Sequence, residues 1–565
     1  MGRHLTREES RVQGSLVKGL TDSDVALLDE FEGNEYKRLP VHVQLATGEL
    51  ENAEVYVWTD PLSRLEQSLW TFEDFLRDSA HKWIGKEGED RGEYKEVDRR
   101  RAMNGNITPT GVKQVAEKVK AELTNGKHEN GTLVVEEFGR SLARKYFNFQ
   151  RGWINLNHGS YGVAPKPVLD SFRRHQDRSN SMPDQFMRFE YMKDLDRMRG
   201  RLADFVHCDM DDLAIVSNAS MGVNSVMRGL TTHWQKGDKI LYYSTTIYEA
   251  CSATIRYIID SHPHLELETV PVVLKYPMSH GDVIEATKQA ILDNERKGGG
   301  KIRLALVDAI SSNPGVVVPW HDLVKLFKEH DILSLVDAAH EIGQMPVNLR
   351  ESKPDFWVSN CHKWLLAHRG CAVLYVSKPY QHLVHSIPTG HYYRNRLEGK
   401  AAEDPAWHLE FEWNGTIDFS PILSTVDALD FRKDVLGGEE RITKYCHELA
   451  LEGGRAFAEI LGTETMENKD PEKDGQLVAN MINVRLPIDL PSADLEPKER
   501  LKRIAHIRTT FHAEQCKRKT MVPFFIHDDK PWTRLSAQVY TEVQDFVDVA
   551  NIVKQVCEQL NASQD

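Results

Sequence analysis

A lysine, an aspartate and a run of small polar residues each follow a strand-like apolar segment in this sequence. Lys363 comes after PDFWVSN (354–360), Asp337 ends ILSLV (332–336), and SNASMG (217–222) follows DLAIV (212–216). Burial at a strand end lowers the pKa of a lysine and favours the neutral amine that attacks carbonyl groups. A buried carboxylate needs a positive partner, and the free N–H groups at a helix start can hold a phosphate.

Each of these features also has an ordinary structural interpretation. SNASMG alone is an N-cap, Asp337 alone could cap a helix, and a lone lysine usually extends its amine into water. Together, at strand ends of one sheet, they supply the three contacts that pyridoxal 5'-phosphate requires. The lysine condenses with its aldehyde, the carboxylate keeps its ring nitrogen protonated, and the helix start holds its phosphate. The combination therefore predicts this cofactor.

Alternating strands and helices position these groups. Buried strands are expected at 212–218, 239–246, 302–310, 331–340 and 354–360, and the segment after 218 has apolar residues at the helical positions 223, 226, 227 and 230. This alternation is typical of a parallel α/β sheet, whose ligands bind at the carboxyl ends of the strands. The polar residues cluster there: Asn218, Ser220, Tyr248, Asp308, Ser311, Ser312, Asp337, His340, Ser359, His362 and Lys363.

The composition indicates an ordinary globular chain of two to four domains. Its 565 residues are 40% hydrophobic and 28% charged, and 71 basic against 85 acidic residues give a net charge of −14. This charge argues against nucleic acid or an anionic membrane as a partner. The seven cysteines are scattered singly, and no apolar run reaches the roughly 18 residues of a membrane helix. We predict a cytoplasmic protein without a metal site.

Four segments are expected along the chain. Residues 1–85 have strand-like runs at 41–48 and 53–58 and an amphipathic helix at 68–84, and residues 86–133 form a charged linker with a short helix at 112–123. Residues 134–390 form a large cofactor-binding domain. Residues 391–565 form a smaller C-terminal domain that includes substrate-binding elements.

A series of ordered motifs links most of this chain to a known family. From about residue 134 onward it resembles the fold-type I pyridoxal-phosphate enzymes of the class V aminotransferase group, within them the isopenicillin N epimerase-like branch that includes fungal hercynylcysteine sulfoxide lyases. The resemblance implies a mostly parallel seven-stranded sheet flanked by helices, with a smaller α+β domain. It is carried by NLNHGSYG (155–162), SNASMGVN (217–224), TTIYEAC (245–251), DAISSNPGVVVPW (308–320), VDAAHEIG (336–343), SNCHKWLLAHRGCAVLYV (359–376), FEWNGTIDFSP (411–421), LGGEERI (436–442) and WTRLSAQVY (532–540).

The resemblance implies roles for the cofactor-binding residues. Lys363 matches the Schiff-base lysine, and Asp337 matches the partner of the pyridinium nitrogen. Tyr248 matches the aromatic residue that stacks on the ring, and His340 lies beside the phenolic oxygen. The expected phosphate contacts are Asn218, Ser220, Ser359 and His362.

The resemblance also implies a substrate site. Arg534 matches the arginine that grips the substrate carboxylate, for which a planar fork of donors is suited. Asn157 and Tyr161 belong to a glycine-rich loop near the substrate, and Tyr161 is a candidate catalytic residue. Arg188 is a further candidate, with a purely structural role equally open.

A segment that reaches the neighbouring subunit implies a homodimer with shared active sites. Gly415 and Thr416 match residues that, in relatives, contact the phosphate of the partner subunit. Trp413, Tyr392 and Tyr393 lie nearby in sequence and could surround a trimethylammonium group through cation–π contacts. Aromatic residues of this kind are also ordinary core residues.

The resemblance points to a C–S lyase that acts on a small amino-acid-derived substrate. The favoured reaction converts hercynylcysteine sulfoxide to ergothioneine, with pyruvate and ammonia. Alternatives are an amino-acid epimerase, another pyridoxal-phosphate enzyme of secondary metabolism, and an inactive fold kept as a binding partner. A cysteine desulfurase is disfavoured because it needs a mobile thiol, and Cys446 and Cys516 lie in helical segments.

The first segment resembles a second family. GLTDSDVALLDEFEGNEYKRLPV (19–41) and VYVW (55–58) are similar to the central portion of the AIG2-like, γ-glutamylcyclotransferase-like barrel. The resemblance places Glu32 at the position of that family's acid/base glutamate. The family's first strand and glycine-containing loop have no counterpart, and half a barrel leaves strand edges unpaired. We therefore expect an incomplete domain and assign Glu32 no role.

Overall fold

Two units make up the computed structural model, residues 1–132 and residues 133–565. The structure describes residues 36–44, 50–58, 135–393, 406–468 and 470–563. In the first unit β1 (Tyr36–Gln44) and β2 (Leu50–Trp58) pair in antiparallel fashion. Strand β2 includes the predicted strand 53–58, and β1 includes residues 41–44 of the predicted strand 41–48, whose other residues lie outside the described ones. The helices expected at 68–84 and 112–123, and Glu32, lie outside the described residues.

A seven-stranded sheet forms the centre of the second unit, in the order β3-β9-β8-β7-β6-β4-β5. Strand β9 runs antiparallel to both neighbours, and the other pairs are parallel. This confirms the mostly parallel sheet, with two strands, β5 and β9, that the pattern did not single out. The strands are β3 (Leu213–Val216), β4 (Lys239–Tyr243), β5 (Glu268–Val272), β6 (Ile302–Asp308), β7 (Leu333–Asp337), β8 (Phe356–Asn360) and β9 (Ala372–Val376).

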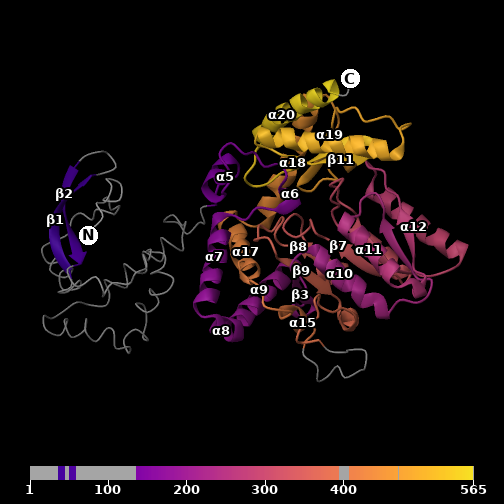
Figure 1. Cartoon of the computed structure of the whole chain (residues 1–565), viewed down its shortest axis with the longest axis horizontal. Helices are drawn as coiled ribbons and strands as arrows, with labels where there is room; N and C mark the ends of the chain where they lie inside the picture. Colours follow the sequence, from indigo (N-terminus) through magenta and orange to yellow (C-terminus); the bar gives the residue numbers. More distant parts are fainter. Residues whose placement is uncertain (1–35, 45–49, 59–134, 394–405, 469, 564–565) are drawn as a thin grey trace. The chain divides into compact units, whose positions relative to one another are not determined.

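In every strand except the edge strand β5, alternate residues enter two different hydrophobic clusters, one on each face of the sheet. In β7, Leu335 joins one cluster and Val336 the other. One face is covered by α10 (Ala219–Gly229) and α11 (Glu249–Ser261). The opposite face is covered by α9 (Tyr191–Val206), α12 (His280–Lys297) and α13 (Trp320–Glu329), so the sheet is the middle of three layers (Figure 1). Because both faces are buried, the strands are continuous apolar runs.

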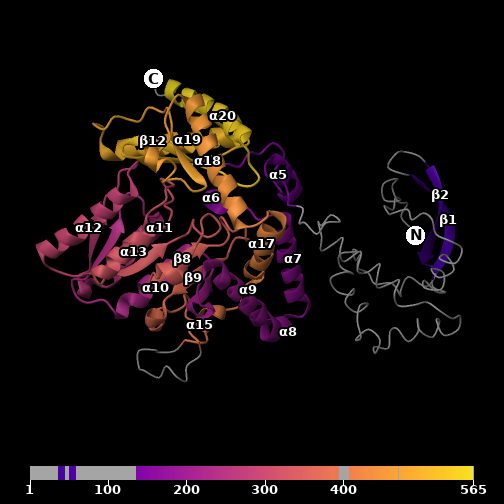
Figure 2. The same cartoon turned by 180° about the vertical axis from the view of Figure 1, so that it is seen from behind.

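A three-stranded antiparallel sheet forms the smaller domain, in the order β10-β12-β11. Its core joins residues of the sheet to the long helices, which lie together at the end of the unit that holds the C-terminus (Figure 2). The elements are β10 (Met481–Arg485), β11 (Phe524–His527), β12 (Lys530–Ser536), α18 (Glu439–Leu461), α19 (Pro497–Lys517) and α20 (Val543–Ala562).

Further helices and turns complete the second unit. They are α5 (Arg140–Tyr146), α6 (His158–Tyr161), α7 (Lys166–Ser181), α8 (Pro183–Gln185), the π-helical turn η3 (Phe186–Glu190), α14 (Leu349–Ser352), α15 (Leu409–Glu412), α16 (Ser420–Leu423), α17 (Thr425–Asp430) and the π-helical turn η9 (Phe431–Val435). Residues 407–429 contribute Trp407 and Phe419 to the two clusters of the large sheet. Among the described residues no helix has the length and apolarity to span a membrane, and no group of ligating side chains suits a metal ion.

Candidate active site

Lys363 lies in the turn after β8, where its amine meets His340 from the turn after β7. Lys363 Nζ is 3.0 Å from His340 Nε2, and Trp364 Nε1 donates to His340 Nδ1 at 3.2 Å. An indole N–H can only donate, so Nδ1 carries no proton and the hydrogen of the neutral ring is on Nε2. Nε2 must then donate to a lone pair on Nζ. In this tautomer the Lys363 amine accepts a hydrogen bond, which only its unprotonated form can do.

The surroundings of the amine favour the same state. Burial, together with the positive charge of Arg534, lowers the pKa of Lys363 to about 8, although Asp337 and Cys251 oppose the shift. Burial also holds the pKa of His340 well below its ordinary value. The neighbouring imidazole is neutral, and the Lys363 amine loses its proton at a pH only slightly above neutral. The Lys363 amine is therefore suited to accept a proton.

Asp337 is the last residue of β7 and lies beside Asp308, its register partner at the end of β6. Its Oδ1 accepts from the N–H of Ala339 at 3.1 Å, and its Oδ2 accepts from the thiol of Cys251 at 3.2 Å. Burial raises the pKa of Asp337, and the charge of Asp337 adds to burial in raising the pKa of Asp308. A buried carboxylate with so few donors can bind a cationic ring nitrogen.

The start of α10 is attached to the strand that precedes the lysine. Asn218 is the N-cap, and its side chain accepts from the N–H of Met221 at 2.9 Å. Asn360, the last residue of β8, accepts from the N–H of Ala219 at 2.8 Å. Ser220 lies in this first turn. The positive end of the helix dipole suits a phosphate, and Asn360 holds the start of this helix in place. No sequence pattern indicated the contact between Asn360 and Ala219.

Two predicted phosphate contacts have partners within the fold. The hydroxyl of Ser359 donates to the carbonyl of Ala338 at 2.5 Å and accepts from the N–H of Ile342 at 3.2 Å. The Nδ1 of His362 donates to the carbonyl of Cys371 at 3.0 Å, and burial lowers the His362 pKa to about 4. Both side chains therefore tie the lysine turn to neighbouring loops.

Arg534, in the middle of β12, is a buried cation held by neutral groups. It is 2% exposed, and in the described part of the chain no carboxylate pairs with it. It donates to the carbonyl and hydroxyl of Ser312 at 2.7 and 3.1 Å, to Asn157 Oδ1 at 3.3 Å and to Ser160 Oγ at 3.1 Å, while its Nε has no partner. Burial lowers its pKa to about 10, opposed by the nearby and exposed Tyr161. Such a cation is costly unless an anion binds to it.

The remaining predicted residues lie apart from these contacts. Tyr248 is half-exposed at the start of α11, and Gly415 and Thr416 lie in the loop between α15 and α16. Arg188 is exposed on η3 and pairs with Asp184 at 3.0 Å. Within the described ranges, none of these predicted residues hydrogen-bonds to the lysine or to the buried arginine.

One chain of hydrogen bonds near the lysine was not predicted. His158 Nε2 donates to the carbonyl of Lys363 at 2.8 Å, since a carbonyl only accepts, and Nδ1 therefore accepts from the hydroxyl of Tyr540 at 2.9 Å. Tyr540 in turn accepts from Asn155 Nδ2 at 2.8 Å. Burial lowers the His158 pKa to about 4, which keeps the ring neutral as this chain requires. His158 and Tyr540 both lie in quoted motifs, but spacing alone gave them no role.

The three aromatic residues proposed around a trimethylammonium group make different ring contacts, although the N–H of His391 donates to the carbonyl of Trp413 at 3.3 Å. Trp413 packs against Tyr191 and Phe419, with ring centroids 5.9 and 6.3 Å apart. Tyr392 and Tyr393 each lie against a different histidine. Trp413 thus has the core role that was the alternative interpretation.

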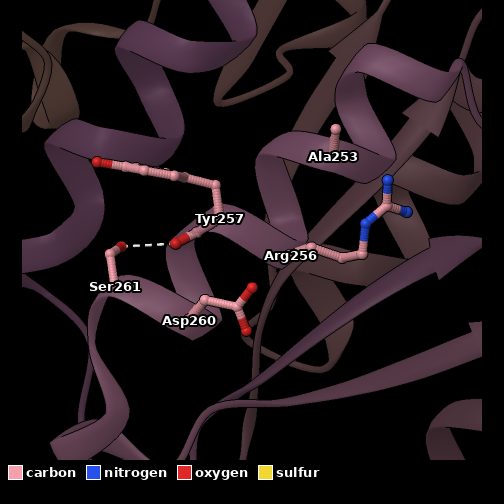
Figure 3. Close-up of a pocket in the computed structure, with 5 residues that line it drawn as sticks. All are labelled: Ala253, Arg256, Tyr257, Asp260 and Ser261. Atoms are coloured by element: carbon pink, nitrogen blue, oxygen red, sulfur yellow. Dashed lines mark hydrogen bonds between the residues drawn. The ribbon is translucent and has the colours of Figure 1, made fainter.

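A surface hollow on α11 contains none of the predicted site residues. It is lined by Ala253, Arg256, Tyr257, Asp260 and Ser261, and the hydroxyl of Ser261 donates to the carbonyl of Tyr257 at 2.6 Å (Figure 3). All five residues belong to one helix, so this hollow supplies no converging groups from different strands. The chemistry lies instead at the ends of β7 and β8.

The residues at these strand ends fit pyridoxal 5'-phosphate. Lys363 would hold its aldehyde carbon, Asp337 its ring nitrogen and the start of α10 its phosphate, and Arg534 would face a substrate carboxylate. Residues 162–486 match the family model Aminotransferase class-V. The chain belongs to the class-V aminotransferase family. Membership confirms the fold-type I architecture, this cofactor and an enzymatic role. Residues 4–75 match the model Gamma-glutamyl cyclotransferase, AIG2-like, which confirms the second resemblance.

Curated relatives share most of their length with this chain. The L-cysteine desulfhydrase-like protein lolT1 of Epichloe uncinata is 34% identical over 75% of this chain and 96% of the relative. The hercynylcysteine sulfoxide lyase of Schizosaccharomyces pombe is 29% identical over 73% and 97%. The isopenicillin N epimerase of Amycolatopsis lactamdurans is 24% identical over 73% and 98%. The first two names describe C–S bond-cleaving enzymes, so the chain is similar to C–S lyases of this family.

A solved structure of the cystine C-S lyase C-DES has the same fold. It superposes with a TM-score of 0.58 at 15% identity, covering 72% of this chain and 98% of that one. At this identity the likeness establishes the fold alone.

Proposed function

We propose that the second unit is a pyridoxal-phosphate-dependent C–S lyase that acts on a cysteine-derived amino acid, with hercynylcysteine sulfoxide as substrate and ergothioneine as product. The observation that carries the proposal is the contact between the buried Lys363 amine and the neutral imidazole of His340, near enough to the buried Arg534 for the charge of Arg534 to lower the lysine pKa. A base and a carboxylate-binding cation in one pocket suit removal of the α-proton of an amino acid. Similarity to two named C–S-cleaving relatives supports the choice of outcome.

The roles of the residues follow from this geometry. When bound, the cofactor supplies an electron-poor ring that accepts the electrons of the α-C–H bond. Arg534 holds the substrate carboxylate, Lys363 takes the α-proton, and Asp337 keeps the ring nitrogen positive. The electron pair of the Cβ–S bond leaves with sulfur, and water converts the carbon skeleton to pyruvate and ammonia. When the substrate is a sulfoxide, the sulfur-containing part leaves as a sulfenic acid. Two thiols then reduce this sulfenic acid to ergothioneine and are themselves oxidised to a disulfide, with release of water.

The cysteines argue against a desulfurase. All seven lie in the described part of the chain, and six of them are buried. Cys251 is nearest to the site, but burial and Asp337 raise its pKa well above the ordinary value, so its thiol stays protonated. Cys516 is exposed at the end of the charged helix α19. The protonated thiol of Cys251 is a poor nucleophile for taking up sulfur from the substrate, because the thiolate is the reactive form.

A substrate panel tests the proposal. The cofactor-loaded protein is incubated with hercynylcysteine sulfoxide, L-cysteine, cysteine sulfinate and an epimerisable amino acid, with dithiothreitol as reductant, and pyruvate, sulfide and chirality are measured. Pyruvate from the sulfoxide supports the proposal. Pyruvate and sulfide from cysteine alone identify a desulfhydrase, inversion without pyruvate identifies an epimerase, and a loaded protein without turnover identifies a binding partner.

A Lys363→Ala variant is the matched control for this panel. Borohydride treatment of the loaded wild-type protein should add the mass of the reduced cofactor to the peptide that contains Lys363. The variant should show no such addition and no turnover. Attachment to another lysine in the wild-type protein would refute the assignment of Lys363.

We also propose a cytoplasmic homodimer with shared active sites, supported by the match of Gly415 and Thr416 to a segment that crosses between subunits in relatives. Mixed dimers test the shared site. Lys363→Ala and Thr416→Glu subunits, each inactive alone, should regain about a quarter of the wild-type activity when mixed, because half of the dimers then hold one intact site. Continued inactivity in dimers shown to have exchanged subunits would refute sharing.

A further inference from the structure

Arg432 is a fully buried cation that contacts both loops of the active site without facing the pocket. It lies in η9, is 1% exposed, and forms a two-pronged pair with Glu439 at 2.7 and 2.5 Å. Its other N–H groups donate to the carbonyl of Trp364 at 2.8 Å and to the carbonyl of Gly343 at 2.9 Å. The guanidinium of Arg432 therefore donates four hydrogen bonds to three residues.

The two carbonyls belong to the segments that carry the predicted catalytic groups. Trp364 directly follows Lys363, and Gly343 ends the turn that begins at Asp337 and contains His340. The segments touch at this point, since a Cβ on Gly343 would lie 2.7 Å from the Trp364 carbonyl oxygen. Arg432 thus bridges the lysine turn and the histidine turn where they are closest.

Glu439 holds the arginine in this orientation. It is the first residue of α18, where the positive end of the helix dipole stabilises a carboxylate. The segment LGGEERI that contains it is a motif of the family resemblance, but neither the cofactor nor the proposed reaction uses it. An Arg–carboxylate fork at the start of the longest helix of the smaller domain is a rigid anchor for the two turns.

We propose that Arg432 is a positioning residue that fixes the turn of Lys363 against the turn of Asp337 and His340. The inference rests on the proposed role of Lys363. A lysine at position 432 would keep the positive charge but could not bind Glu439 in a fork and reach both carbonyls as well. The contact between the Lys363 amine and His340 would then loosen.

The protonation of Lys363 reports this loosening. The groups that act on its amine are His340 in direct contact, Arg534, Asp337 and Cys251. Arg432 is not among the main electrostatic causes, and Arg432→Lys preserves its charge. A change in the Lys363 titration in this variant therefore reflects the geometry of the turn and the entry of water.

The test is acetic anhydride labelling of the cofactor-free protein across a pH series, with the Lys363 peptide quantified by mass spectrometry. We expect a midpoint near pH 8 in the wild-type protein. In Arg432→Lys the midpoint should rise by about one unit, which corresponds to about tenfold less neutral amine at pH 7. Glu439→Gln, which keeps Arg432 but weakens the fork, should shift it in the same direction by less.

Arg199→Lys is the matched control. The Arg199 side chain is equally buried, pairs with Asp196 at 2.7 Å and donates to the carbonyl of Met210 at 2.9 Å, without a hydrogen bond to either turn. Its replacement should lower the melting temperature but leave the labelling midpoint unchanged.

An unchanged midpoint in Arg432→Lys, or an equal shift in Arg199→Lys, would overturn the proposal. If Arg432→Lys does not fold, the midpoint of Glu439→Gln decides in the same way. The labelling uses neither cofactor nor substrate, so a negative result in the lyase panel leaves this result readable.

Discussion

Replacement of Arg534 by methionine separates substrate binding from folding. The side chain is 2% exposed and has only neutral partners in the described part of the chain. We expect Arg534→Met to lose the grip on the substrate carboxylate while the protein stays folded. The two effects have different magnitudes, and both follow from the structure.

The stability of the free protein should change little. Burial lowers the pKa of Arg534 to about 10, so at neutral pH the buried cation costs about 3 kcal/mol relative to water. This cost is present throughout the range below pH 10, where the guanidinium is charged in both states. Methionine removes the cost together with four hydrogen bonds worth about 1 kcal/mol each, so the free energy of unfolding should change by about 1 kcal/mol or less.

Ligand binding should change far more. A guanidinium fork gives a carboxylate two charge-assisted hydrogen bonds of about 1.5–3 kcal/mol each, so their loss weakens binding about 10²- to 10⁴-fold. L-alanine and ethylamine differ only by the carboxylate. As competitive inhibitors of pyruvate formation, or in spectral titrations of the loaded protein, L-alanine should lose this factor in Arg534→Met whereas ethylamine should not.

Equal weakening of both ligands would refute the reasoning, because it would show general damage to the pocket. Retention of L-alanine binding would show that another group holds the carboxylate. Arg534→Lys, which keeps the charge but loses the fork, should fall between the wild-type protein and Arg534→Met.

Further predictions concern the supports of the site. Trp364→Phe removes the N–H that fixes the tautomer of His340, so the lysine ammonium can donate to it and the labelling midpoint should rise above about pH 8. Burial raises the pKa of Glu341 to about 7 in the folded protein, against 4.5 in the unfolded chain. The free energy of unfolding should therefore fall by about 3 kcal/mol as the pH rises from 4.5 to 7. In Glu341→Gln, urea unfolding measured over this pH range should show no such fall. Gly162→Ala places a methyl group 1.7 Å from a carbonyl oxygen and should cost at least about 3 kcal/mol, whereas Gly298→Ala, which has open space, should cost about 1 kcal/mol; equal melting temperatures would contradict this.

The sequence predicted the groups that follow strands. Asp337 and Lys363 were found because parallel strands end at the same edge of a sheet, and the apolar runs before them are long and fully buried. Strand β5 was missed because it is an edge strand with exposed residues and Pro271, which give no apolar run.

The supports of the site were beyond sequence patterns for a different reason. His158 reaches Tyr540 across 382 residues, and Arg432 reaches Trp364 across 68. Local periodicity describes neighbours within one helix or strand, and it contains no information on which distant side chains meet. The different ring contacts of Tyr392, Tyr393 and Trp413 have the same origin, since packing against other residues decides them.

The hydrogen-bond chain from Asn155 through Tyr540 and His158 to the lysine carbonyl depends on residues that are synthesised at very different times. A ribosome makes Lys363 long before it makes Tyr540, so the reactive turn emerges without its support. A chain interrupted between these positions has the amine but cannot hold it in place. Capture of the cofactor should therefore mark polypeptides that extend at least through Tyr540, past the final strand β12.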